Sequence, residues 1–282
     1  DVGSYTSVAI DTYGYAHISY YGGIGNLKYA TNAFGFWITS TVDSAGDVGL
    51  YTSIAVDTSG KVHISYYDRT NGDLKYATNV SGTWATTTVY RNGDAGLYTS
   101  IVLDAYGYVH ISYYDSTNGD LKYTNNVLGV WFTFTVDRSG DVGGYTSLQV
   151  DASGYAHISY FDGTNGDLKY ATSESGSWVR TTVDRSGLVG EYTALGLDAS
   201  GYAHISYYDT TNGDLKYATN ASGSWATATL DSSQDVGRHN SIAVDKSGHS
   251  YISYQDATNG NLKYATDESG VWIITTVDSS GV

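Results

Sequence analysis

The sequence predicts an all-β fold built from six copies of one small antiparallel sheet. Its tryptophans recur at a constant spacing of 47 residues, and each repeat holds four short segments in which polar and apolar residues alternate. The 34 glycines and 29 tyrosines agree with this fold, because Gly permits tight turns and aromatic residues suit half-buried strands. No helix is expected. The tryptophans are Trp37, Trp84, Trp131, Trp178, Trp225 and Trp272.

The second repeat shows how each sheet is expected to form. Its strands are predicted at Tyr51–Asp57, Val62–Asp68, Leu74–Thr78 and Trp84–Val89, and we call these positions strands A, B, C and D in every repeat. The segments between them are rich in Asp, Asn, Ser and Gly, as tight turns are. The Asn-Gly pair between strands B and C is typical of a β-hairpin.

A four-stranded sheet cannot bury two apolar faces alone, so neighbouring repeats are expected to stack face to face. Four strands in 47 residues match a propeller blade, since such repeats are roughly 40 to 50 residues long. Strand A is rich in small residues, which suits a crowded central position. We therefore predict a six-bladed β-propeller as a single domain over residues 1–282. Its blades cover about 1–46, 47–93, 94–140, 141–187, 188–234 and 235–282.

The chain resembles the six-bladed β-propeller family over essentially its whole length. The turn Asn79–Trp84, which has the sequence N-x-S-G-x-W, is similar to a degenerate Asp box of sialidase-like propellers. The aspartate of the box is missing, and the tryptophan follows the glycine one position early. The resemblance implies a site of three arginines, a tyrosine nucleophile and an acid. Arg91, Arg138 and Arg185 occupy one equivalent position in adjacent repeats, so they would point from separate blades.

The charge of the chain limits its partners. It has 29 acidic and 14 basic residues and a formal net charge of −15, which disfavours nucleic acid and anionic membrane surfaces. The absence of cysteine excludes disulfides, thiolate metal sites and a cysteine nucleophile. No apolar run approaches the roughly 18 residues that span a bilayer. The sequence lacks methionine, which favours a processed segment, and we expect a secreted or cell-surface protein.

Strand direction sorts the acidic residues. The linkers from strand D to strand A and the B–C hairpins should emerge on one face of each blade, and the A–B and C–D turns on the other. The first face should therefore be strongly acidic. Its hairpin aspartates are candidate calcium ligands: Asp68, Asp73, Asp115, Asp120, Asp162 and Asp167. Their spacing differs from that of the helical calcium-binding loop, and a structural turn without metal explains Asn-Gly equally well.

A ligand site on the same face is predicted from aromatic and acidic residues. Tyrosines that open strand A can stack on a sugar ring, and linker aspartates can accept hydrogen bonds from its hydroxyls. The candidates are Tyr5, Asp47, Tyr51, Asp94, Tyr98, Asp141, Tyr145 and Tyr192. His239 takes the place of the tyrosine in the last repeat. Most tryptophans are expected between blades.

Two further sets of repeated residues have a structural explanation. The strand-B histidines are too widely spread to share one metal ion and should form interior hydrogen bonds to a strand-A serine or a turn aspartate. The strand-C lysines should pair with aspartates and lie along aromatic rings. The histidines are His17, His63, His110, His157 and His204, and the lysines are Lys28, Lys75, Lys122, Lys169, Lys216 and Lys263.

Near-identical repeats favour multivalent binding over catalysis, because an active site is one asymmetric group of residues. We therefore expect a non-enzymatic, lectin-like propeller that binds glycans or another repetitive ligand and requires no cofactor, with Ca2+ as a candidate bridge. The alternatives are a glycosidase or lyase, with Glu191, Arg238 and His239 as the irregular residues on adjacent blades, or a scaffold for a protein partner.

Overall fold

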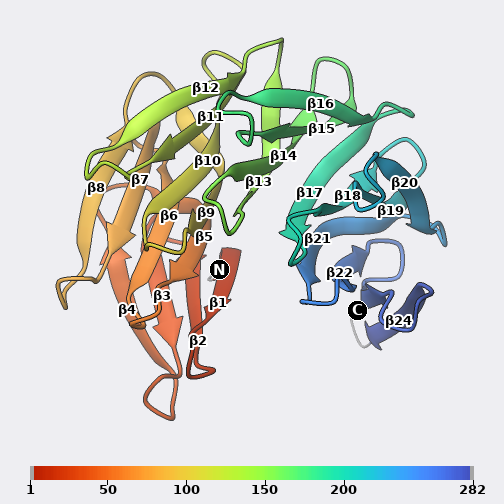
Figure 1. Ribbon diagram of the computed structural model, residues 1–282. Helices are drawn as coiled ribbons and strands as arrows, with labels where there is room; N and C mark the ends of the chain where they lie inside the picture. The colour runs from red at the N-terminus through yellow and green to blue at the C-terminus, as the bar shows by residue number, and fades with distance from the viewer. Residues whose placement is uncertain (1–2, 280–282) are drawn as a thin grey trace. The chain divides into compact units, whose positions relative to one another are not determined.

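The protein forms six four-stranded antiparallel sheets in the computed structural model, which describes residues 3–279 (Figure 1). Each sheet is one repeat of the sequence, and its strands follow chain order across the sheet. The described residues contain strands, turns and bends but no helix, so none of them forms a helix that could cross a membrane. The chain divides into two compact units, Asp1–Ser139 and Gly140–Val282, with three sheets in each.

The strands of the first unit form three sheets. These are β1 (Ser4–Ile10), β2 (Ala16–Tyr21), β3 (Leu27–Thr31) and β4 (Ile38–Asp43), then β5 (Val48–Val56), β6 (Val62–Asp68), β7 (Asp73–Thr78) and β8 (Ala85–Tyr90), and then β9 (Ala95–Leu103), β10 (Val109–Asp115), β11 (Asp120–Asn125) and β12 (Phe132–Asp137).

The strands of the second unit repeat this pattern. They are β13 (Val142–Val150), β14 (Ala156–Asp162), β15 (Asp167–Thr172) and β16 (Val179–Asp184), then β17 (Val189–Leu197), β18 (Ala203–Asp209), β19 (Asp214–Thr219) and β20 (Ala226–Asp231), and then β21 (Val236–Val244), β22 (Ser250–Asp256), β23 (Asn261–Thr266) and β24 (Ile273–Asp278).

The predicted all-β fold of four-stranded blades is confirmed, and the strand boundaries shift by a few residues. The largest difference is at strand A, which begins at Val48 in the second repeat rather than at Tyr51. The residues before Tyr51 pair with the end of β6, but two β-bulges interrupt the register. Because each bulge breaks the period-two alternation, the pattern in the sequence does not extend across it.

The apolar core lies between adjacent sheets. One cluster combines Leu27 and Tyr29 of the first repeat with Val48, Ile64 and Tyr66 of the second, all of them buried. Equivalent clusters join the second repeat to the third, the fourth to the fifth and the fifth to the sixth. A single sheet therefore depends on its neighbour to cover its apolar face, as the repeat pattern predicts.

Backbones of adjacent sheets approach closely at one glycine of strand A. Gly49 has a φ of 102°, and a Cβ atom there would lie 2.8 Å from the Cα of Leu27 in the preceding sheet. Gly96 has the same relation to Leu74. Glycine is thus required at this position for two reasons, the backbone conformation and the lack of space.

Tryptophans fill the outer part of the same interfaces, as the sequence indicates. Trp84 packs edge-on against Tyr29 of the preceding sheet, with 5.2 Å between ring centroids, and Trp225 packs in the same way on Tyr170. Trp37 in the first repeat is 55% exposed. Edge-to-face packing of this kind adds to the energy of area burial.

Buried polar residues also join adjacent sheets. The carboxylate of Asp43, at the end of β4, accepts hydrogen bonds from the Tyr66 hydroxyl at 2.7 Å and from Lys75 Nζ at 2.5 Å, both in the next sheet. Asp184 accepts from Tyr207 and Lys216 in the same geometry, and Asp231 from Tyr254 and Lys263. We call this group the carboxylate lock. It confirms for three of the strand-C lysines that they pair with aspartates and lie over tyrosine rings, as Lys75 does over Tyr66. Lys28 of the first repeat donates to Thr41 instead.

The third repeat lacks this lock. Tyr90 stands where the other repeats end strand D with aspartate, and its ring lies 5.7 Å from that of Tyr113. The Tyr113 hydroxyl is buried and has no hydrogen-bond partner among the described residues. Lys122 instead lies 3.2 Å from Asp120 and donates to Thr135. The chain thus contains interfaces with the carboxylate lock and one interface in which the carboxylate is missing.

Stability at low pH depends on the lock. Burial alone would raise the pKa of the Asp184 carboxyl, but hydrogen bonds from Lys216, Ser186 and Tyr207 outweigh burial and lower the pKa to about 2. The pKa of Asp231 falls to about 2 for the same reasons. A carboxyl whose pKa is lower in the folded state stabilises the fold above its unfolded pKa, and this contribution is lost as pH falls toward the folded value.

We therefore expect the free energy of unfolding to decrease between about pH 4 and pH 2, by about 2 kcal/mol for each of these carboxyls. Urea denaturation across this pH range measures it. The control is the double variant Asp184→Asn and Asp231→Asn, which should be less stable at pH 7 and show a flatter pH dependence. An unchanged slope in the double variant would contradict the assignment.

A matched pair of substitutions tests the lock directly. Tyr66→Phe removes a hydroxyl that donates to a carboxylate, and should reduce the free energy of unfolding by about 1.5 to 3 kcal/mol. Tyr113→Phe removes a buried hydroxyl that donates to no carboxylate, and because a buried hydroxyl without a partner is costly, stability should stay the same or increase. Chemical denaturation of both variants provides the measurement. Equal losses in the two variants would show that the carboxylate adds nothing.

Candidate functional site

The residues that were predicted to open strand A, which lie near its start in the structure, have an unusual backbone conformation. Each of them has a positive φ. Within residues 3–279, the only further non-glycine residue with a positive φ is Gln234. Left-handed backbone costs an L-residue roughly 1 to 2 kcal/mol, so its recurrence in every repeat requires a compensating contact or a function. The residues are Tyr5, Tyr51, Tyr98, Tyr145, Tyr192 and His239, with φ between 50° and 54°.

This conformation places the strand-A rings in contact from repeat to repeat. In the first unit, Tyr51 lies between Tyr5 and Tyr98, with centroid distances of 4.7 and 4.8 Å. In the second unit, Tyr192 lies between Tyr145 and His239, at 4.8 and 4.6 Å. The structure thus brings the predicted ligand-binding tyrosines of each unit together. We call each set an aromatic row.

The hydroxyl of Tyr51, in the middle of the first aromatic row, stays protonated at neutral pH. Burial raises the pKa of Tyr51 above its usual value, and the neighbouring Tyr98 and Tyr5 add to the shift. A protonated phenol can donate one hydrogen bond and accept another. Tyr5 is 45% exposed, whereas the other tyrosines of the two rows are half-buried. Each of these tyrosines therefore keeps part of its surface exposed to solvent.

The predicted linker aspartates lie next to a second tyrosine. The Tyr67 hydroxyl, at the end of strand B, donates to Asp94 Oδ1 in the next repeat at 2.5 Å, and Tyr21 donates to Asp47 at 2.9 Å. Burial and the hydrogen bond to Asp94 raise the pKa of Tyr67. The strand-A ring of Tyr51 lies 6.3 Å from that of Tyr67. Each interface of this kind therefore combines two tyrosines with one carboxylate.

A hairpin threonine holds each linker in place. The backbone N–H of Asp47 donates to Thr70 Oγ1 at 2.7 Å, and the N–H of Asp94 donates to Thr117 at the same distance. Asp141 is held in this way by Thr164. These contacts confirm that linkers and B–C hairpins share one face of the blade, as strand direction predicts. The carboxylates remain partly exposed to solvent.

One interface of the second unit has lost the polar pair. Phe161 replaces the strand-B tyrosine, and Leu188 replaces the linker aspartate of the next repeat. Leu188 still donates its backbone N–H to Thr211 at 2.7 Å, so the loop geometry is retained. Both partners have changed together, which indicates that hydroxyl and carboxylate are useful only as a pair.

The interface between the fifth and sixth repeats has an added cation. Arg238 lies 3.0 Å from Asp235 and 5.2 Å above the ring of Tyr208, whose hydroxyl donates to Asp235 at 2.7 Å. Glu191, which the sequence grouped with Arg238 and His239, accepts a hydrogen bond from Thr210 at 3.0 Å. The structure shows no hydrogen bond from Glu191 to Arg238 or His239 within the described residues.

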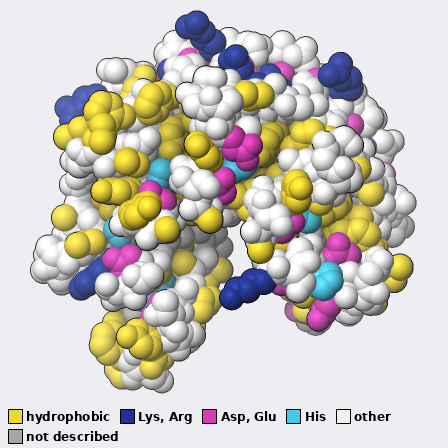
Figure 2. Space-filling view, in the orientation of Figure 1, with side chains coloured by type: hydrophobic (Ala, Val, Ile, Leu, Met, Phe, Trp, Pro, Cys, Tyr) yellow, Lys and Arg dark blue, Asp and Glu magenta, His cyan; other side chains and the backbone are white. Residues whose placement is uncertain are grey.

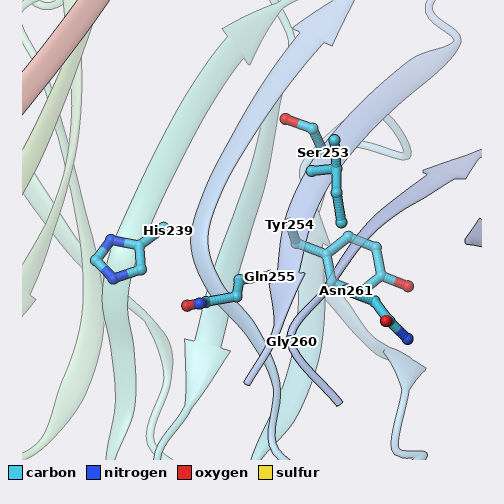
Figure 3. Close-up of a pocket in the computed structure, with 7 residues that line it drawn as sticks. His239, Ser253, Tyr254, Gln255, Gly260 and Asn261 are labelled. Atoms are coloured by element: carbon cyan, nitrogen blue, oxygen red, sulfur yellow. The ribbon is translucent and has the colours of Figure 1, made fainter. Parts of the chain in front are cut away.

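A pocket lies in the sixth repeat. It has a volume of about 370 Å3, and Figure 3 shows His239 and Gln255 on one side of Tyr254 within it. Leu262 lines the pocket and is 46% exposed, whereas the equivalent Leu215 is fully buried. Gln255 occupies the strand-B position that holds tyrosine in most repeats, so this pocket lacks the aromatic pair.

The candidate calcium ligands lie at the B–C hairpins in opposed pairs. Asp68 pairs with Asp73 in the register of β6 and β7, as Asp115 does with Asp120 and Asp162 with Asp167. Asp68 is buried. Its carboxylate accepts hydrogen bonds from the backbone and side-chain nitrogens of Asn71 at 3.1 and 2.9 Å, and it lies 3.8 Å from Lys75 Nζ. These are the contacts of a structural turn, and calcium binding there stays a prediction.

Asp73 shows the electrostatic consequence of this pairing. Burial and the charge of Asp68 raise its pKa. Two carboxylates in register repel each other, and the strand-C lysine reduces that repulsion. The hairpin ends of the second to fifth repeats therefore contain closely spaced acids that the fold already partly neutralises.

The strand-B histidines lie near the opposite turns. His63 Nδ1 faces the Tyr76 hydroxyl at 2.5 Å, and its Nε2 lies 3.9 Å from Asp57 of the A–B turn. That distance is too long for a hydrogen bond, and the predicted bond to the turn aspartate forms instead at His17 and His110, each at 3.3 Å. The strand-C tyrosine is the closer partner and was not predicted. Figure 2 shows histidine surfaces with acidic neighbours at several places on the face in view.

The three arginines of the sialidase comparison are exposed residues directly after strand D. Arg91 lies near Asp73, whose pKa it lowers slightly against the effect of burial. Arg138 follows Asp137, and Arg185 follows Asp184. Within the described residues, none of them forms a hydrogen bond or a cation–π contact with a tyrosine of the aromatic row.

Two substitutions at Tyr51 should separate the effect of its left-handed backbone on stability from the effect of its ring. Tyr51→Asn and Tyr51→Val both remove the ring, but asparagine tolerates the left-handed region and a β-branched residue does not. We expect the Val variant to be about 1 to 2 kcal/mol less stable than the Asn variant, as measured by chemical denaturation. Equal stability would mean that the φ of about 52° is not maintained in solution.

Solved structures show the same fold. No family model matches the chain, and no curated protein is similar to it in sequence. The fungal lectin from Aleuria aurantia, a six-bladed β-propeller described as recognising fucose, is 14% identical, and the match covers 98% of this chain and 95% of the lectin with a TM-score of 0.62. The lectin SapL1, solved with α-methyl fucoside, is also 14% identical over 97% and 96% of the two chains, with a TM-score of 0.62.

An enzyme shares the fold as well. A polysaccharide lyase, an ulvan lyase of family PL25, is 14% identical over 95% of this chain and 82% of its own, with a TM-score of 0.66. At such low identity these likenesses establish the fold alone, which is a six-bladed β-propeller. They agree with the fold expected from the repeats.

Proposed function

We propose that the protein is a non-enzymatic, multivalent glycan-binding propeller. The observation that carries the proposal is the recurrence of one arrangement at successive interfaces: a strand-A tyrosine with left-handed backbone, a strand-B tyrosine and a linker carboxylate. Tyr51, Tyr67 and Asp94 form one example, and Tyr5, Tyr21 and Asp47 another. The proposal places the ligand on the face that carries the linkers and hairpins.

The chemistry of these residues suits a neutral sugar. Carboxylate oxygens accept hydrogen bonds from sugar hydroxyls, and a tyrosine hydroxyl both donates and accepts. The face of an aromatic ring packs against the apolar side of a pyranose. Asp94 and Asp47 keep their positions through backbone contacts to hairpin threonines, so little ordering is required on binding.

Because the sites are nearly identical, we expect most of the affinity to come from avidity. Each site offers few contacts and should bind weakly, but a repetitive ligand can occupy several sites of one chain. The lost polar pair at Phe161 and Leu188 and the added Arg238 predict that the sites are not equivalent. A single-site variant should therefore weaken binding without abolishing it.

The similar structures direct the choice of ligand and location. Two of them are lectins described with fucose or a fucoside, so fucosylated glycans are the first ligands to test. We propose a secreted or cell-surface location, with residues 1–282 acting as one domain. We also propose that no cofactor is required and that any calcium acts through the hairpin aspartates, such as Asp68 and Asp73.

A polysaccharide lyase is the second candidate. The group of Arg238, Asp235 and Tyr208 is the most irregular polar arrangement of the described linkers, and a lyase of the same fold is known. A lyase removes a proton from the sugar and expels the glycosidic oxygen, which requires a base, an acid and a cation near one another. Multivalent binding is favoured because the same constellation recurs elsewhere without the cation.

A glycan array compares the native protein with Tyr51→Asn, which keeps the backbone conformation but removes the ring. We expect binding to fucosylated or other repetitive glycans, with apparent affinity about tenfold weaker in the variant. The matched control is Tyr106→Asn, because Tyr106 is 84% exposed on an A–B turn and should not affect binding. A parallel array with chelator tests the proposed calcium.

Two results would contradict this function. One is the absence of glycan binding both with and without chelator, which would favour a scaffold for a protein partner. The other is turnover of a polysaccharide that is lost in Glu191→Gln or in Arg238→Gln, since it would establish catalysis at an irregular interface.

A further inference from the structure

The fourth repeat carries one acidic residue that distinguishes it from its neighbours. Glu174 lies in the turn between β15 and β16, where the first, second, third and fifth repeats have alanine or valine. These equivalent residues are Ala33, Val80, Val127 and Ala221. The sixth repeat also has a glutamate there, Glu268, but it lacks the strand-B histidine and has Tyr251 instead.

The fold places Glu174 next to a buried histidine. His157 pairs with Thr172 of β15 and with Gln149 of β13, and Glu174 and Asp151 each lie two residues beyond those partners. Both turns therefore fold back over the imidazole. His157 Nε2 lies 3.4 Å from Asp151 Oδ2 and 3.6 Å from Glu174 Oε1.

The imidazole nitrogen between these carboxylates has no hydrogen-bond partner. His157 is completely buried, and its Nε2 forms no hydrogen bond within the described residues. A buried polar atom without a partner is costly, and two carboxylates beside it supply charge without satisfying its geometry. Histidine Nε2 and one oxygen from each of Asp151 and Glu174 lie within 4.8 Å of one another.

We propose that His157, Asp151 and Glu174 bind a single zinc ion at the A–B and C–D turns of the fourth repeat. Ligand atoms at about 2.0 to 2.1 Å from a tetrahedral zinc are about 3.3 to 3.4 Å apart. The distances of 3.4 and 3.6 Å from Nε2 to the two carboxylates come close to that separation. An imidazole ligand favours zinc over calcium or magnesium, which prefer oxygen alone.

The surroundings prepare each ligand for this role. The second imidazole nitrogen, Nδ1, faces the Tyr170 hydroxyl, so its N–H can donate there and leave the Nε2 lone pair for the metal. Asp151 Oδ1 accepts backbone hydrogen bonds from Ser153 and Tyr155 at 2.9 Å, which leaves Oδ2 directed at the histidine. Glu174 is half exposed and completes the site from the solvent side.

Three protein ligands leave a fourth position for water or another small ligand. Asp151 also lines a cavity of about 430 Å3 between the A–B turns of the fourth and fifth repeats. The site lies on the opposite side of the blade from the linker and hairpin, so it is separate from the proposed glycan face. Its presence does not depend on glycan binding.

The other repeats show why the third ligand matters. His204 Nε2 lies 3.6 Å from Asp198 and is also without a hydrogen-bond partner, but Ala221 stands where the fourth repeat has Glu174. Two ligands on a rigid pair of turns hold zinc weakly, whereas three define an open tetrahedral site. The chain therefore supplies its own comparison.

The test uses the full chain without an affinity tag, stripped with chelator and then equilibrated with zinc chloride. Elemental analysis after dialysis should find a single tightly bound zinc ion, and zinc should raise the melting temperature. Glu174→Ala should weaken binding at least about tenfold and remove the thermal shift. The matched control, Glu268→Ala, removes a glutamate from the equivalent turn of the sixth repeat, where Tyr251 replaces the strand-B histidine, and should bind like the native protein.

A gain of binding provides the second arm. Ala221→Glu recreates the third ligand beside Asp198 and His204, so this variant should bind a second zinc ion. X-ray absorption of the native protein with zinc should show nitrogen and oxygen ligands at about 2.0 to 2.1 Å. Circular dichroism confirms that each variant is folded.

Three results would overturn the proposal. They are the absence of tightly bound zinc in the native protein, zinc binding that survives Glu174→Ala, and a loss of zinc in Glu268→Ala. Because Glu174 is a turn residue on the surface, its replacement should leave the fold intact, and a negative result can be attributed to the site.

Discussion

A carboxylate at the end of one sheet reaches into the next, where a buried tyrosine and a buried lysine both donate to it. Asp43, Tyr66 and Lys75 show this arrangement, and the apolar clusters between sheets surround it. A buried lysine would be costly alone, and so would a buried carboxylate. Where the lock is present, a sheet therefore satisfies the charge of its neighbour while it covers that neighbour's apolar face. Every other feature of the protein depends on this stacking.

The aromatic rows are a consequence of the same stacking. Glycines such as Gly49 let adjacent backbones approach, and two residues later a tyrosine with left-handed backbone places its ring against the neighbouring repeat. The energetic cost of that conformation is offset by ring contacts and by the rigidity of the paired sheets. The proposed glycan sites thus contain tyrosines with strained backbone, which the contacts between sheets hold in place. The sites recur because these contacts recur.

The opposite face of each blade has a different chemistry. There the turns fold over a buried histidine, and a single added carboxylate converts a common structural pair into a candidate metal site. Glu174 does so in the fourth repeat, whereas Glu268 meets Tyr251 in the sixth. A repeat protein can acquire a new site in this way without altering its fold, because the residues of a turn contribute little to the packing between sheets.

The sequence by itself determined the number of sheets, their four strands and the need to stack them, since a period of 47 residues and alternating strands reflect local geometry and burial. It also indicated that the strand-C lysines pair with aspartates. Only the tertiary structure decided which aspartate meets Lys75, that Tyr51 has a positive φ, and that His157 lies between Asp151 and Glu174. Those pairings depend on bulges and on the register between turns and sheets. The alternation of polar and apolar residues along one strand predicts neither the bulges nor this register.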